Sequence, residues 1–216
     1  MKKDYIFQVS TVDFLLNRNY SGFESLKKLL KHGDFGIGTF SGLDGEMIIH
    51  NGKIFQANHT GAINEINKHG KTPFAVTTFF NPQHNVLIEN AGSKEVKTAM
   101  LKQFISIELI YAIKIKGLFQ MIDLCSGAKQ HKPYPDFNTV AKNITQYKLE
   151  ETEGTIIGFY FPEIYKKISG EGFHFHFIDK KLKTGGHVND FFIHHATVET
   201  EIKTGIKIHL AKPPVI

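Results

Sequence analysis

The sequence has few of the features that mark secreted or membrane proteins. A single cysteine, Cys125, excludes an intrachain disulfide and is typical of proteins from a reducing compartment. No window approaches the roughly 20 apolar residues that a membrane-spanning helix needs. The first residues lack the apolar run of a secretion signal, because Asp4 and Gln8 interrupt it. We therefore expect a cytoplasmic protein that does not enter membranes.

Tryptophan is absent, whereas phenylalanine occurs 19 times among 216 residues, of which 41% are hydrophobic. This composition predicts a core lined by phenylalanine, whose ring has no polar atom that needs a partner. The formal net charge of +5 comes mostly from scattered lysines. Surfaces that bind nucleic acid have clustered basic residues with aromatic side chains among them, and no such patch is present. We therefore expect no nucleic-acid partner.

Periodic patterns of apolar residues predict more strand than helix. Helices are expected at 21–31 and from Ser93 to about Ile105. The expected strands are 35–40, 46–50, 53–57, 74–80, 85–89, 109–116, 118–124, 155–161, 172–178, 187–193 and 196–210. The pattern indicates an α+β protein. The polar stretch 149–154 favours a division into a mixed α/β subdomain, residues 1–150, and a β-rich subdomain, residues 151–216.

The segment from Gly172 to Ile178 alternates between histidine and phenylalanine. Because successive side chains of a strand point to opposite faces, His174 and His176 share one face of this strand. A glycine-rich turn follows, and His187 begins the returning strand. The pattern H-x-H-x10-H in a predicted hairpin can therefore gather three imidazole rings around one ion.

Three imidazole nitrogens leave one position open on a tetrahedral zinc ion, which is typical of catalytic sites, since structural sites are normally closed by four protein ligands. Imidazole also binds copper, iron, nickel and cobalt, so the pattern favours zinc without excluding these metals. The alternative interpretation is a hairpin whose three histidines simply face solvent.

The sequence resembles the bacterial α-acetolactate decarboxylase family over most of its length. The segments that carry the resemblance are Gln8–Thr11, Leu29–Phe40, Gly42–Glu46, Gln130–Pro135, Gly172–Phe177 and Gly185–Val188. The Leu-Asp-Gly-Glu and Gly-Gly-His-Val motifs are specific in this order and spacing.

The resemblance implies a lyase that converts (S)-2-acetolactate, a 2-hydroxy-3-oxo acid, to (R)-acetoin and CO2. It implies zinc held at the positions of His174, His176 and His187. Glu46 matches a family glutamate, and Thr39 matches a family threonine near the substrate. The implied fold has two mixed α/β subdomains that share an extended sheet, and the implied assembly is a homodimer.

The chemistry explains why such a site needs a metal and an acid. Loss of CO2 from a β-keto acid leaves two electrons, and a Lewis acid that binds the substrate oxygens stabilises the resulting enediolate. The enediolate must then be protonated on one face, which requires a positioned acid and a polar group that orients the substrate. Without the resemblance, Glu46 would be read as an exposed carboxylate at the start of a strand.

Two features depart from the family that the sequence resembles. The family carries an arginine at the position of Cys125, and this arginine is implied to stabilise or protonate the enediolate. A thiol supplies neither a fixed charge nor a forked donor; Cys125 is then a reactive thiol or a small buried residue. Lys129 stands at a second family arginine position and keeps a positive charge. Family members also continue past the last strand with a tail that carries another glutamate. The sequence stops at Ile216 and has no glutamate after its last expected strand.

These observations leave three functions open. The first is a zinc-dependent acetolactate decarboxylase, with an impaired rate or an altered substrate. The second is a zinc-dependent hydrolase on a related scaffold, because a metal ion can activate water with few other groups. The third is a catalytically silent relative that binds a metal or a 2-hydroxy acid.

Overall fold

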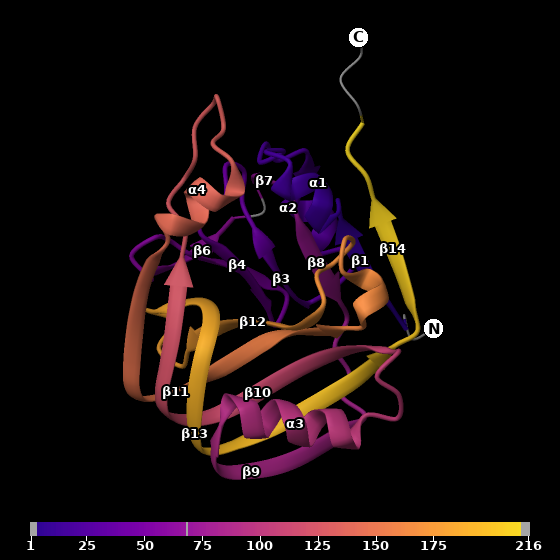
Figure 1. Ribbon diagram of the computed structural model, residues 1–216, viewed down its shortest axis with the longest axis vertical. Coiled ribbons are helices and arrows are strands. Elements are labelled where there is room, and N and C mark those ends of the chain that lie inside the picture. The colour runs from indigo at the N-terminus through magenta and orange to yellow at the C-terminus, as the bar shows by residue number, and fades with distance from the viewer. Residues whose placement is uncertain (1–3, 68, 213–216) are drawn as a thin grey trace.

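The computed structural model describes residues 4–67 and 69–212, and two β-sheets form its body (Figure 1). The first sheet has the strand order β14, β1, β8, β3, β4, β5, β6. In chain order these strands are β1 (Tyr5–Val9), β3 (Phe35–Thr39), β4 (Glu46–His50), β5 (Lys53–Ala57), β6 (Ile63–Ile66), β8 (Ala75–Thr78) and β14 (Gly205–His209). Neighbours are antiparallel except β1 and β14, which run parallel. The last strand of the chain thus joins the first.

The second sheet is built from longer strands that close on themselves. They are β9 (His84–Gly92), β10 (Ile110–Ser126), β11 (Thr145–Phe161), β12 (Gly172–Asp179) and β13 (Gly185–Lys203). β10 pairs with β11 along one edge and with β13 along the other, and β12 joins β11 to β13. These four strands form a closed ring of pairings, and β9 is added along β13.

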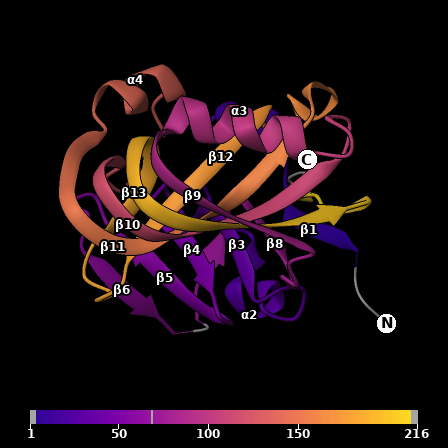
Figure 2. The same cartoon turned by 90° about the horizontal axis from the view of Figure 1, so that it is seen from below.

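Short helices cover the two sheets. The longest, α3 (Ser93–Gln103), crosses the second sheet and packs Val96 and Met100 against it (Figure 2). α2 (Leu26–Leu29) lies on the outer face of the first sheet. α1 (Val12–Leu16) and α4 (Phe137–Lys142) lie together at one end of the molecule (Figure 1).

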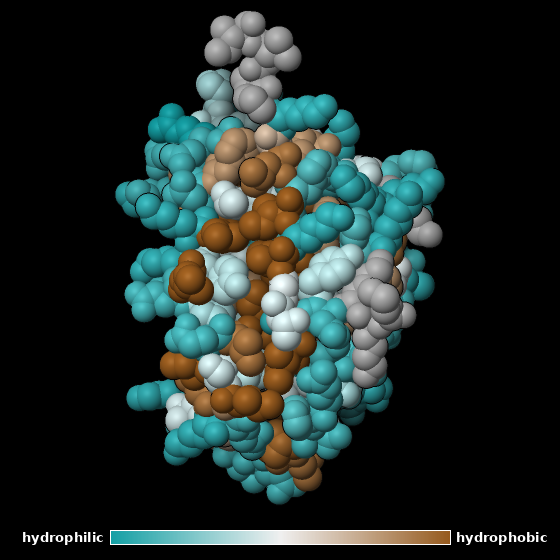
Figure 3. All heavy atoms as spheres, turned by 90° about the vertical axis from the view of Figure 1, so that its right-hand side faces the viewer, coloured by the Kyte–Doolittle hydropathy of each residue, from teal (hydrophilic) through white to brown (hydrophobic). Residues whose placement is uncertain are grey.

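A 3-10 turn, η1 (Glu163–Tyr165), and a ribbon of β2 (Glu24–Ser25) and β7 (Lys71–Thr72) complete the elements. Within the described residues, every helix is too short or too polar to cross a membrane. On the face that carries β14, apolar side chains gather in a band that runs from one end of the molecule to the other (Figure 3).

The main core lies between the sheets, where Ile37 and Ile48 of the first sheet belong to one cluster with Ile157 and Phe159 of the second. A second core fills the ring and contains Phe119, Phe175, Phe177 and Phe191. Complete burial of such a side chain stabilises a fold by roughly 1.5–3 kcal/mol. The predicted α+β class, the excess of strand and the phenylalanine-lined core are confirmed.

Two of the predicted elements are wrong in detail. The helix expected at 21–31 is only the single turn α2, because Phe23 and Glu24 are held extended by backbone pairing with Thr72. The two strands expected on either side of Gly117 are one strand, β10. Gly117 does not turn the chain; a Cβ there would lie 2.1 Å from the carbonyl oxygen of His195, so glycine is needed for close strand contact.

The two sheets draw on different parts of the chain. Residue 150 lies inside β11, which runs on without a break, and the first sheet is built from residues 5–78 together with 205–209. The strand expected at 187–193 and the first part of that expected at 196–210 are one strand, β13, and the break comes at Thr204, after which β14 begins. Residues 213–216, the last of the sequence, after which the resemblance implies a further tail with a glutamate, lie outside the described residues.

Candidate metal centre

The hairpin of β12 and β13 presents its histidines as the alternation predicts. Phe175 and Phe177 enter the core of the ring, and His176 points the other way, where it reaches the carbonyl oxygen of Met47 in β4. His187 lies directly opposite His176 in the ladder. Directly paired residues of antiparallel strands project on the same face, so the third imidazole joins the first two.

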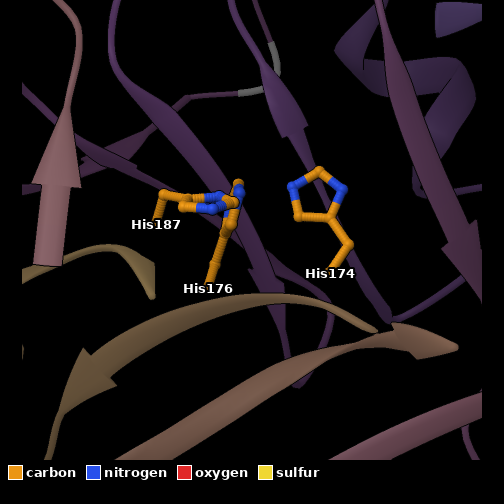
Figure 4. A group of neighbouring side chains, drawn as sticks. All are labelled: His174, His176 and His187. Carbon is orange, nitrogen blue, oxygen red and sulfur yellow. The ribbon is translucent and has the colours of Figure 1, made fainter. Parts of the chain in front are cut away.

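The three imidazole rings form a compact triangle (Figure 4). Ring centroids are 5.2 Å apart for His174 and His176, 5.0 Å for His174 and His187, and 5.5 Å for His176 and His187. One ring nitrogen of each lies within 4.8 Å of the other two. The hairpin therefore brings three nitrogen ligands to one place.

The electrostatics of the triangle fit a metal ion. Burial lowers the pKa of His174 to about 3 and that of His187 to about 4, and the pKa of His176 lies well below its usual value for the same reason. All three rings are therefore neutral near pH 7 and carry a free lone pair, which metal binding requires.

His176 also has the hydrogen-bonding pattern of a metal ligand. Its Nδ1 donates to the carbonyl oxygen of Met47 at 2.8 Å, which leaves the lone pair on Nε2. That Nε2 is buried and makes no hydrogen bond among the described residues. A buried polar nitrogen without a partner is rare, and a cation held with His174 and His187 would satisfy it.

Glu46 and Thr39 lie beside the triangle, across the β3–β4 hairpin from each other. Glu46 Oε2 is 3.3 Å from His176 Nε2, and burial raises the pKa of Glu46 to about 8. Gly45 sets this position, since its φ of +75° favours glycine and a Cβ would lie 2.3 Å from the carbonyl oxygen of Ala57. The Thr39 hydroxyl donates to the carbonyl oxygen of Gly45 at 2.8 Å and keeps its lone pairs for another donor.

The triangle, Glu46 and Thr39 open into one cavity of about 390 Å³. Its far wall is apolar and comes from α1 and α4, with side chains that include Leu15, Leu16 and Val140. Such a wall excludes water and suits the alkyl part of a small ligand, while the polar groups gather at the histidines.

Cys125 also lines this cavity, because β10 pairs it directly with His187. Its thiol is 3.5 Å from Oδ1 of Asn189, and burial raises the pKa of Cys125 to about 11. The thiol is therefore neutral and weakly nucleophilic near pH 7. This matches the interpretation of a small buried residue rather than a reactive thiol.

Lys129, at the second family arginine position, does not line the cavity among the described residues. Its ammonium group lies 3.5 Å from the Asp44 carboxylate, and its side chain is 54% exposed. The sequence, in turn, did not single out Asn189, which lines the cavity. The sequence did contain a signal for Asn189. Asn189 follows His187 by two residues in the same expected strand, and side chains two residues apart in a strand lie on the same face.

Known proteins resemble this chain over most of its length. A family model for alpha-acetolactate decarboxylase matches residues 6–214. The alpha-acetolactate decarboxylase of Methylococcus capsulatus is 35% identical over 206 residues, which are 95% of this chain and 79% of that protein. That of Brevibacillus brevis is 37% identical over 198 residues, 91% of this chain and 70% of that protein.

A crystal structure of alpha-acetolactate decarboxylase from Bacillus subtilis superposes with a TM-score of 0.95 at 33% identity. The match covers 97% of this chain and 90% of that one. Sequence and fold therefore agree over almost the full described length, and the chain belongs to the alpha-acetolactate decarboxylase family.

Proposed function

We propose that this protein is a zinc-dependent lyase that decarboxylates 2-acetolactate to acetoin and CO2. The observation that carries the proposal is the triangle of neutral imidazoles beside Glu46, in a chain of this family. Three nitrogen donors and no cysteine in the triangle favour zinc with one position left for substrate. Such an ion, when bound, supplies a Lewis acid that draws electron density from the substrate oxygens.

The residues of the chain divide the remaining work. His174, His176 and His187 hold the ion, and the bond from His176 to Met47 fixes the ring that packs deepest. Glu46 exchanges the proton, because its carboxyl lies beside the triangle, 3.3 Å from His176 Nε2, and burial favours its protonated form. Thr39 accepts a hydrogen bond from the substrate hydroxyl and so orients the substrate.

Turnover is slower than in relatives that carry an arginine at the position of Cys125, because the described part of the cavity wall has no cation to replace that arginine. Lining side chains include Cys125 and Asn189 but neither lysine nor arginine among the described residues. A missing donor for developing negative charge typically lowers the rate by about 10²–10³. We therefore propose slow turnover, or a substrate that depends less on a cation.

A single assay separates this function from its rivals. Purified protein loaded with zinc is given racemic acetolactate, and CO2 and acetoin are measured together with the metal content of the same sample. Stoichiometric CO2 and acetoin that vanish in His187→Ala support the proposal. Hydrolysis of simple esters without acetoin would instead favour the hydrolase, and about one metal per chain with no turnover would favour the silent relative.

We further propose that the protein works as a homodimer in the cytoplasm. The apolar band in Figure 3 supports self-association, because monomers rarely expose large contiguous apolar patches. Light scattering of the purified protein tests this, and a monomer at micromolar concentration would refute it.

A further inference from the structure

One tyrosine outside the cavity is built into the support of the third histidine. Tyr147 stands on β11 and reaches across β10 to the turn that joins β12 to β13. Its hydroxyl donates to the carbonyl oxygen of Gly185 at 2.5 Å, two residues before His187. It packs against the core of the ring, on the opposite side of the backbone from the imidazoles.

Two backbone segments approach Tyr147 closely. A Cβ on Gly186, the residue next to His187, would lie 2.3 Å from the Tyr147 hydroxyl oxygen. A Cβ on Gly61, in the loop between β5 and β6, would lie 2.6 Å from the Tyr147 ring. Tyr147 is therefore held between two backbone segments that approach it more closely than any side chain would allow.

The loop between β5 and β6 of the first sheet also holds the β12–β13 turn by backbone hydrogen bonds. The amide of Gly185 donates to the carbonyl oxygen of Gly61 at 3.0 Å, and the amide of Ile63 donates to that of Lys183 at 2.9 Å. Gly185 is thus fixed at its amide by Gly61 and at its carbonyl by Tyr147. Burial raises the pKa of Tyr147, so its hydroxyl stays protonated and remains a donor.

We propose that Tyr147 is a positioning residue for the metal centre, which holds the β12–β13 turn so that His187 faces His174 and His176. The inference rests on the proposed metal-binding function. Groups that hydrogen-bond directly to metal ligands typically contribute about 10–100-fold to metal affinity, and Tyr147 acts one step further away through the Gly185 carbonyl, so its effect lies at the lower end. Loss of the Tyr147 hydroxyl therefore weakens metal binding by about ten-fold while the cavity itself is unchanged.

The test is titration of the metal-free protein with Co²⁺, followed by its visible absorption. Tyr147→Phe is expected to bind Co²⁺ about ten-fold more weakly, with an altered band shape, because the geometry of one ligand relaxes. Tyr160→Phe is the matched control: Tyr160 lies on the same strand and its hydroxyl also donates to a backbone carbonyl, that of Ile107, at 3.2 Å. Thermal unfolding of the metal-free variants measures any general loss of stability.

The outcomes are distinct. Equal Co²⁺ affinity in the wild type and Tyr147→Phe would overturn the inference, and so would equal losses in the two tyrosine variants. Gly186→Ala gives a second measurement, since it disturbs the same contact; its effect on affinity should be smaller in the Tyr147→Phe background than alone. Failure of the wild type itself to bind Co²⁺ would overturn the proposed metal site and this inference with it.

Discussion

Replacement of Cys125 by arginine probes what limits the reaction. The thiol lines the cavity next to His187 and is neutral near pH 7. The only arginine of the sequence, Arg18, lies at the surface and faces Asp136 at 3.8 Å, so it supplies no charge to the cavity. Cys125→Arg would place a guanidinium group where the family resemblance implies one.

The expected gain follows from the charge that develops on the substrate. Two unit charges about 5 Å apart in an effective dielectric of about 20 interact by roughly 3 kcal/mol. Since about 1.4 kcal/mol corresponds to ten-fold in rate, we expect kcat to rise by about 10². The cation would also favour the ionised form of Glu46, whose charge already acts on Cys125, so the pKa of Glu46 should fall relative to the wild type.

The assay is the initial rate of acetoin formation between pH 5 and 9, with metal content and melting temperature measured on each sample. Cys125→Gln is the control, because it adds a polar donor to the same wall without a charge. The reasoning predicts a large gain for arginine only and a pH profile moved to lower pH. An unchanged rate in a folded, metal-loaded Cys125→Arg variant would show that the missing cation is not what limits turnover.

Three further predictions concern the metal, pH and packing. Zinc should raise the melting temperature of the wild type but not of His176→Ala, since a ligand stabilises only a fold that binds it; equal shifts in calorimetry would contradict the site. In metal-free protein the pKa of Glu46 is about 8, above its ordinary value of 4.5. Between pH 4.5 and 8 the Glu46 carboxyl is therefore protonated in the folded state but ionised in the unfolded state. The unfolding free energy of the wild type relative to Glu46→Gln should therefore increase as pH falls from 8 to 4.5 in urea titrations, and a decrease would refute the assignment. Gly117→Ala should lose about 1–3 kcal/mol of stability through overpacking, whereas Gly127→Ala, whose added methyl lies 3.5 Å from its nearest neighbour, should be nearly neutral in the same titrations.

The sequence was sufficient for the histidine triangle because it depends on local geometry. Strict alternation puts His174 and His176 on one face, and a glycine-rich turn returns the chain at His187, so a single hairpin contains the whole triangle. The pair of Thr39 and Glu46 is local in the same sense, since one short turn places them opposite each other. Period and turn chemistry are properties of neighbouring residues, and a sequence shows them directly.

The rest of the site was decided by contacts between segments far apart in the chain. Cys125 meets His187 only because β10 pairs with β13, and Tyr147 supports the same turn from β11. Lys129 carries the right charge in the right region, yet it lies outside the cavity beside Asp44. Which strands pair, and which side chain fills a given space, depends on packing of the entire core, and no local pattern of residues encodes that choice.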